Sequence, residues 1–246
     1  KIFENNWTNG NNIDLDIEFV QKIKKELWAF SYPDPYHLYL RVLHELFNQP
    51  EDSNSLELPH DSDKNLLNLM YQTDAIQEII KILNRDNGVI LADVVGLGKS
   101  IIAAAAALNY TKDTKYKVLI IAPPHLTEQW EEYQSQFRLP GASVYSRGVL
   151  ENIEINHDDK LLIIIDEVHG LKNEDTIRYR KLHKICHSNP NNKTILITAT
   201  PFNNSPADLF ALIKLFQVPG ASTLQTVENL SQEFREIVSQ FKKFRN

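Results

Sequence analysis

Four short apolar runs constrain the fold more than any other feature of this sequence. They read GVILA, YKVLIIAP, LLIIID and TILITAT, and they occupy residues 88–92, 116–123, 161–166 and 194–200. Strands that are apolar on both faces belong to a parallel sheet that helices cover on both sides. The stretches between the runs have helical spacing of apolar residues and supply these covers. We therefore expect an α/β fold in three layers, built on a mainly parallel sheet.

The pattern of the chain changes near residue 60. Residues 1–60 contain two stripes of apolar residues with helical spacing, over 13–30 and 38–47, followed by an acidic, polar and proline-containing stretch. We interpret residues 1–60 as a helical accessory region with a linker. The α/β domain is predicted over 61–220, where a long helix that ends before NRDNG precedes the first strand. Residues 221–246 are predicted to be a C-terminal helical extension.

Composition limits the classes of function. The chain has 246 residues and a net charge of −6, which opposes a surface that grips nucleic acid all over, so any such contact must be local. No apolar run approaches the roughly 20 residues that cross a bilayer, and no secretory signal is visible at the start, so we expect no membrane contact. The single cysteine, Cys186, is interpreted as a buried helix residue and fits a cytoplasmic location. Because the chain begins at Lys1, we expect it to be part of a longer protein.

The segment ADVVGLGKS, residues 92–100, joins the first apolar run to an alanine-rich helical stretch. Phosphate-binding loops of the form G-x-x-x-x-G-K-[ST] place backbone amides and a lysine around phosphates at the start of a helix. Gly98, Lys99 and Ser100 fit this form, but Asp93 stands at the position of the first glycine. By itself the segment is therefore either a phosphate loop or an ordinary turn from strand to helix.

Two carboxylates follow the third apolar run. Asp166 and Glu167 stand where that strand should end, and ligands of open parallel sheets collect at this edge. One carboxylate there can hold a magnesium ion, while its neighbour can activate a water molecule. The alternative is a solvated cap on the following loop. A phosphate loop after an earlier strand favours nucleotide hydrolysis over that alternative.

Five segments in order resemble known motifs. YQTDAI, ADVVGLGKS, IAPPHLTEQW, DEVHGLKN and TATPFNN are similar to the Q-type, I, Ia, II and III motifs of superfamily 2 ATPases, most of all those of the SNF2 branch and its bacterial members. In that branch an aspartate commonly stands where Asp93 does, so this residue supports the resemblance. The match covers residues 69 to about 216. Val94, Ser100 and Val168 depart from the common pattern of the branch.

The resemblance implies ATP and Mg²⁺ as cofactors and assigns roles to the matching positions. Catalysis would fall to Lys99 and Glu167, and the magnesium ion to Ser100 and Asp166. Contacts to the nucleotide would come from Tyr71, Gln72, Gly96, Leu97, Gly98, Lys99 and Ser100. Coupling to nucleic acid would involve Gln129, His169, Thr198 and Thr200.

Several of these positions also have ordinary structural interpretations. Tyr71 and Gln72 could be plain polar positions on a helix, and the two threonines could simply pack at a strand end. Trp130, although it matches the family, is interpreted as a core residue.

The resemblance implies the first RecA-like lobe of an ATP-dependent DNA translocase or remodelling ATPase, with duplex DNA and a second lobe as partners. Hydrolysis would need cations from the second lobe, worth about 10³ to 10⁵ in rate, so the chain alone should be weak or inactive. We expect a bacterial, nucleoid-associated protein. Two alternatives stay open: a DEAH-like helicase acting on RNA or DNA, and a non-hydrolysing, nucleotide-gated scaffold.

Overall fold

A five-stranded, fully parallel sheet lies at the centre of the described part of the chain. The computed structural model describes residues 70–92, 98–112, 114–139, 141–171, 173–201, 205–224 and 229–245. The strand order is β1-β5-β4-β2-β3, and every neighbouring pair is parallel. The strands are β1 (Gly88–Ala92), β2 (Tyr116–Ala122), β3 (Ser143–Ser146), β4 (Lys160–Ile165) and β5 (Lys193–Thr198).

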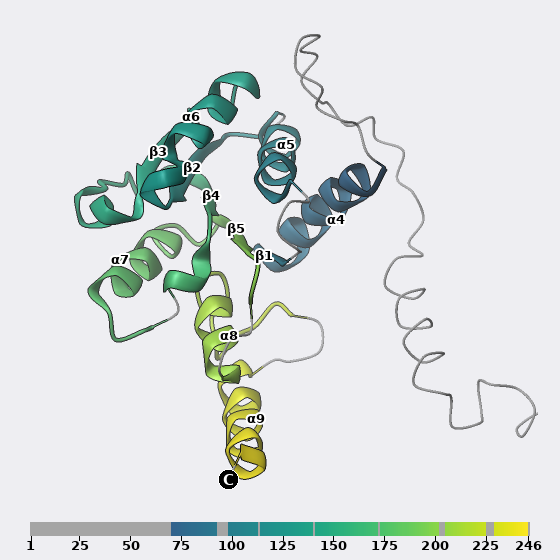
Figure 1. Cartoon of the computed structure of the whole chain (residues 1–246), viewed down its shortest axis with the longest axis vertical. Coiled ribbons are helices and arrows are strands. Elements are labelled where there is room, and N and C mark those ends of the chain that lie inside the picture. The colour runs from purple at the N-terminus through teal and green to yellow at the C-terminus, as the bar shows by residue number, and fades with distance from the viewer. Residues whose placement is uncertain are drawn as a thin grey trace, which may run out of the picture. The chain divides into compact units, whose positions relative to one another are not determined.

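Helices cover both faces of this sheet, which confirms the three-layer prediction (Figure 1). One face packs against α4 (Met70–Asp86), α5 (Lys99–Thr111) and α6 (Thr127–Gln136). The other face packs against α7 (Ile177–Cys186) and α8 (Pro206–Ile213). Five consecutive buried alanines, Ala103–Ala107, let the backbone of α5 approach the sheet closely. α9 (Leu230–Arg245) packs on α8, where the rings of Phe210 and Phe234 stack with centroids 4.6 Å apart.

The four predicted strands are present, whereas β3 was missed. β2, β4 and β5 are almost wholly buried, so both of their faces are apolar and the pattern was visible in the sequence. β3 is only four residues long, lies at the edge of the sheet and reads SVYS, with Ser143 exposed. A short edge strand needs no apolar run, because its register comes from pairing with β2.

The predicted end of the first long helix was wrong by one turn. α4 continues through Arg85 to Asp86 instead of stopping before NRDNG. The next residue, Asn87, caps the helix. Its φ of 63° is left-handed, and its amide still bonds to the carbonyl of Leu83 at 3.2 Å. Asparagine tolerates this conformation better than most residues. The helix therefore stops just before Asn87 and not before Asn84.

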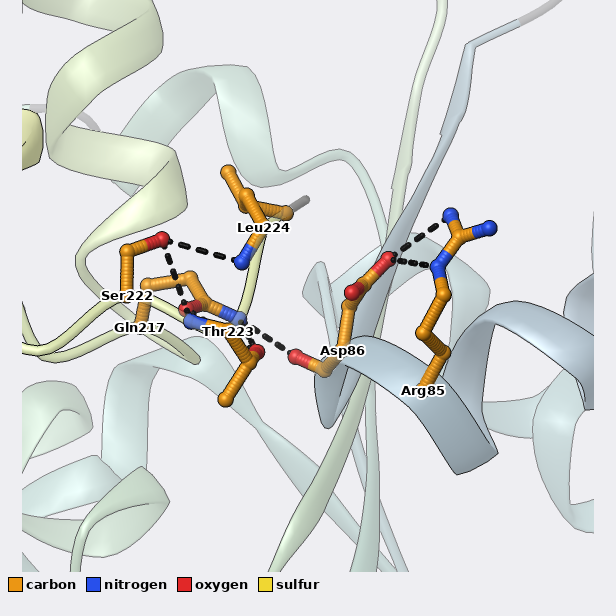
Figure 2. A network of polar contacts seen from close by, with 6 residues as sticks. All are labelled: Arg85, Asp86, Gln217, Ser222, Thr223 and Leu224. Atoms are coloured by element: carbon orange, nitrogen blue, oxygen red, sulfur yellow. Dashed lines mark hydrogen bonds and ion pairs between the residues drawn. The ribbon is translucent and has the colours of Figure 1, made fainter. Parts of the chain in front are cut away.

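The edge of the sheet at which the strands begin contains a network of polar contacts (Figure 2). Gln217 is 2% exposed, and its amide nitrogen donates to the backbone carbonyl of Asp86 and to Thr223 Oγ1. Its amide oxygen accepts from the Thr223 amide at 2.9 Å and from Ser222 Oγ at 3.3 Å. Arg85 pairs with the Asp86 carboxylate at 2.8 Å. The network ties the segment after α8 to the end of α4, 131 residues earlier in the chain.

Several predictions concern residues outside the described part of the chain. These are the helical accessory region and linker over 1–60, and the loop residues Asp93, Val94, Gly96 and Leu97. Within the predicted C-terminal helical extension over 221–246, the structure places α9. Within the described ranges, no helix is both long and apolar enough to cross a membrane.

Candidate active site

Side chains from the ends of several strands line one pocket at the carboxyl edge of the sheet. The phosphate loop follows β1, the motif II carboxylates follow β4, and Thr198 ends β5, which lies between those two strands. The parallel strands thus bring together segments far apart in the sequence. The cavity measures about 410 Å³ and is lined by Gly98, Lys99, Ser100, Ile101, Leu126, Gln129, Tyr133, Asp166, Glu167, His169, Ile197, Thr198 and Ala199.

The phosphate loop enters α5 through Gly98. This glycine caps the helix with φ of 76°, a left-handed conformation that residues with a Cβ rarely adopt, and its carbonyl accepts from the Ile102 amide at 2.9 Å. Lys99 and Ser100 are the first two helical residues, so their side chains lie at the positive end of the helix. A Cβ on Gly98 would stand 3.2 Å from Gln72 Nε2. The structure therefore brings Gln72, near the start of α4, close to Gly98.

Asp166 is the best-anchored carboxylate of the site. It is 3% exposed, and its Oδ2 accepts from Ser100 Oγ at 3.2 Å and from Trp130 Nε1 at 2.9 Å. Its Oδ1 accepts from the Glu167 amide at 2.7 Å. Ser100 and Asp166, predicted as magnesium ligands, are thus in direct contact although 66 residues separate them.

These two oxygen donors fit Mg²⁺. Magnesium is bound by oxygen and commonly takes only one or two protein ligands, with substrate phosphates and water completing its shell. No group of three or more histidine, cysteine or acidic side chains arranged as metal ligands occurs among the described residues. The Ser100 and Asp166 pair therefore suits an ion that arrives with a phosphate-bearing substrate rather than one held in a protein cage.

Glu167 differs from its neighbour in exposure and in backbone geometry. Its side chain is 38% exposed, and its φ of 47° is left-handed, an uncommon conformation for a residue with a side chain. Arg147 donates to its backbone carbonyl at 3.0 Å and lies 3.9 Å from Oε2, and His125 Nε2 lies 3.9 Å from Oε1. The carboxylate thus faces the pocket between two basic side chains.

The predicted coupling residues do not form one uniform group. Gln129 is exposed, lines the pocket and donates to the Tyr133 hydroxyl at 2.8 Å, and burial raises the pKa of that tyrosine. His169 also lines the pocket, and its Nδ1 is buried without a hydrogen-bond partner. Thr198 is buried and its hydroxyl accepts from the Thr200 amide at 3.1 Å, while Thr200 is exposed and does not line the pocket.

Two other predicted contacts lie apart from this cavity. Tyr71 is 43% exposed on α4, and Gln72 donates to its hydroxyl at 3.4 Å, but neither residue lines the pocket. Gly96 and Leu97, predicted to supply amides to the phosphates, lie outside the described residues.

Sequence reasoning missed His125, Tyr133 and Arg147. His125 follows β2 by three residues, and Arg147 directly follows β3. A sequence signal existed for His125, because it stands just beyond a recognisable apolar run whose end should face the site. No comparable signal existed for Arg147, because β3 itself was not recognised.

Two protein-family models match successive parts of the chain. Residues 66–143 match the model described as type III restriction enzyme, res subunit, and residues 149–243 match the model described as SNF2-related domain. Over residues 149–243 the chain is thus similar to SNF2-related domains.

Proteins similar to this chain include a Bacillus subtilis protein named uncharacterized ATP-dependent helicase YqhH. It is 30% identical over 171 residues, which cover 62% of this chain and 29% of that protein. A Mycoplasma pneumoniae protein named uncharacterized ATP-dependent helicase is 26% identical over 235 residues, 84% of this chain and 22% of that protein. The chain thus spans less than a third of the length of either relative.

A solved structure supports the α/β fold of this chain. The Sulfolobus solfataricus SWI2/SNF2 ATPase core in complex with dsDNA aligns with a TM-score of 0.55 and 22% sequence identity. The alignment covers 76% of this chain and 46% of that one. The predicted RecA-like α/β architecture is therefore confirmed.

Proposed function

We propose that this chain contains the first RecA-like lobe of an SNF2-type, ATP-dependent motor that translocates along or remodels DNA. The observation that carries the proposal is the hydrogen bond between Ser100 Oγ and Asp166 Oδ2, at 3.2 Å. It joins the phosphate loop after β1 to the carboxylate pair after β4, across the intervening strand β5. A nucleotide whose phosphates lie at the start of α5 would meet the acid pair there.

Binding of ATP is assigned to the loop and to α4. Lys99 would place its ammonium on the phosphates, and Gly98 would let the backbone approach them. Ser100 and Asp166 would hold Mg²⁺, which when bound neutralises charge on the phosphate oxygens. Tyr71 and Gln72 would contact the adenine, and the amides of Gly96 and Leu97 would face the phosphates.

Hydrolysis is assigned to Glu167. Its exposed carboxylate would accept a proton from the attacking water, while Arg147 and His125 orient it from two sides. Among the described pocket residues, the cations are Lys99 and, depending on protonation, His169. We therefore propose that a second lobe supplies further positive charge, worth about 10³ to 10⁵ in rate, and that this chain alone hydrolyses ATP slowly.

Duplex DNA is the proposed track. The Sulfolobus core was solved in complex with dsDNA, and that protein shares the fold of this chain. Gln129, His169, Thr198 and Thr200 would couple the nucleotide state to the DNA. Because the chain has a net charge of −6, its DNA contact should be local and should weaken steeply with salt. In a bacterium this track would place the protein at the nucleoid.

Steady-state ATP hydrolysis by the full-length protein tests the proposal. Rates would be compared without nucleic acid and with duplex DNA, single-stranded DNA or RNA. We expect strong stimulation by duplex DNA and loss of this activity in Lys99→Ala. The matched control is Lys117→Ala, because Lys117 pairs with Asp159 on the surface and does not line the pocket. Stimulation by RNA or single strands alone would favour the DEAH-like helicase, and nucleotide binding without turnover would favour the scaffold.

A further inference from the structure

Trp130 is a fully buried residue with a polar contact to the site. Its side chain is 0% exposed on α6, and its Nε1 donates to Asp166 Oδ2 at 2.9 Å. The indole N–H is the only donor of a tryptophan and its direction follows the ring plane. Tyr133 packs against this ring edge-to-face at 5.7 Å, and Phe137 packs against Tyr133 in the same way at 6.2 Å. The donor is therefore fixed by core packing.

The three donors to the Asp166 carboxylate differ in their freedom to move. The Glu167 amide belongs to the adjacent peptide unit and bonds to Oδ1. The Ser100 hydroxyl can rotate about its C–O bond, so the direction of its proton is not fixed, and in the proposed function its oxygen would also bind the metal ion. The Trp130 N–H has no such freedom, because its ring is buried in a close-packed core and has no room to turn. Trp130 is thus the donor on Oδ2 whose direction is fixed by the core.

The position of Trp130 also connects two parts of the pocket. The neighbouring residue Gln129 is exposed and lines the pocket, and Tyr133, also on α6, lines it too. One short helix therefore carries part of the pocket wall on one side and the anchor of the carboxylate on the other. A shift of α6 would move the carboxylate with it.

We propose that Trp130 is a positioning residue that sets the orientation of the Asp166 carboxylate for magnesium binding. This inference rests on the proposed function, in which Asp166 serves the magnesium ion of ATP. A hydrogen bond to a metal-binding carboxylate fixes which oxygen faces the ion, and losing such a bond typically weakens metal affinity or activity by about 10- to 100-fold. A purely structural tryptophan would affect stability without affecting the use of magnesium.

Trp130→Phe separates these two roles. Phenylalanine keeps most of the buried aromatic volume and removes the N–H. The matched control is Tyr179→Phe, which removes another buried hydrogen bond, from the Tyr179 hydroxyl to the Ala211 carbonyl at 2.7 Å, on the opposite face of the sheet. Affinity of the 246-residue chain for a non-hydrolysable ATP analogue would be measured by calorimetry with Mg²⁺ and with EDTA.

We expect Mg²⁺ to tighten analogue binding in the parent chain and in Tyr179→Phe, and this tightening to fall by about 10- to 100-fold in Trp130→Phe. Affinity in EDTA should be the same in all three. An undiminished magnesium effect in Trp130→Phe would overturn the inference and leave the proposed function intact. Absence of any magnesium-dependent binding in the parent chain would instead contradict the proposed function itself.

A second measurement keeps the inference testable if Trp130→Phe does not fold. The chain contains three tryptophans, and Trp7→Phe with Trp28→Phe leaves Trp130 as the only indole. Because the Trp130 N–H bonds to the proposed metal ligand, adding Mg²⁺ with the analogue should change the emission of this indole saturably, and Lys99→Ala should abolish the change. Unchanged emission at concentrations that calorimetry shows to be saturating would overturn the inference.

Discussion

The two edges of the sheet use polar residues in opposite ways. At the amino edge, the polar groups of Gln217 are satisfied by protein neighbours, and the amide joins two distant segments (Figure 2). At the carboxyl edge, the polar groups surround a cavity of about 410 Å³, and the basic groups nearest the Glu167 carboxylate oxygens lie 3.9 Å away. Hydrogen bonds join distant segments at the amino edge, whereas at the carboxyl edge polar side chains line the cavity of the proposed ATP site.

The contrast extends to the reactive groups. A second cavity, of about 250 Å³, lies at the amino edge and is lined in part by Cys186 and Gln217. Burial raises the pKa of the Cys186 thiol to about 12, so this cavity contains no ready thiolate. The contrast between the two edges is not complete. At the amino edge, one buried oxygen, Asp86 Oδ1, has no hydrogen-bond partner, and the same is true of His169 Nδ1 at the carboxyl edge. These are the two such atoms among the described residues.

The largest expected effect tests the carboxyl edge. Glu167→Gln removes the proposed base and should lower kcat of the DNA-stimulated full-length protein by roughly 10²- to 10⁴-fold. The melting temperature and the affinity for ATP should stay unchanged, because the side chain is 38% exposed and makes no short hydrogen bond. Glu128→Gln, an exposed position on α6, is the matched control. Hydrolysis by Glu167→Gln at the parent rate would contradict the assignment.

Gln217→Ala tests the amino edge, where we expect a substitution to change stability and to leave ATP binding unchanged. It removes several buried hydrogen bonds and should lower the free energy of unfolding by about 2–4 kcal/mol, measured by urea denaturation. The affinity for ATP should be unaffected. Gln232→Ala, at an exposed position on α9, should have neither effect. A Gln217→Ala protein with parental stability and weakened ATP binding would break the comparison between the edges.

A pair of identical substitutions compares the edges directly. In Gly88→Ala the new methyl group would stand 2.2 Å from the Phe216 ring, so we expect a loss of stability of about 1–3 kcal/mol with normal ATP binding. In Gly98→Ala an alanine would have to adopt the left-handed φ of 76°. This backbone conformation costs about 1–2 kcal/mol for a residue with a Cβ and should distort the loop. The affinity for ATP should then fall by roughly tenfold. Equal loss of ATP affinity in both variants would contradict the separation of roles.

The smallest expected effect is a pH dependence near the amino edge. Burial, with help from nearby His187 and Lys214, lowers the pKa of His183 below its ordinary value of 6.5. The unfolded chain therefore binds the proton more tightly than the folded chain does. The contribution to stability is complete above about pH 6.5 and is lost as the pH falls through the lowered pKa. His183→Phe should flatten the fall in melting temperature on acidification, and an identical pH profile would contradict this.

Much of the candidate site could be anticipated because its signals are local in sequence. Lys99 and Ser100 stand in a loop of recognisable spacing, and Asp166 and Glu167 end an apolar run. Positions at the ends of parallel strands are predictable in this way, since the fold itself gathers them at one edge. Arg147 and β3 were not predictable, because a four-residue edge strand leaves no comparable pattern.

The sequence by itself determined the four apolar strands, the three-layer class and the position of the carboxylate pair at a strand end, because each rests on residues close together along the chain. The phosphate loop stays a prediction. Only the tertiary structure decided that Trp130, expected to be a core residue, also donates to Asp166, 36 positions away. It likewise decided that Arg147 reaches Glu167 and that Gln217 reaches Asp86. Hydrogen bonds between distant segments depend on how the helices pack on the sheet, and no local pattern of residues encodes that packing.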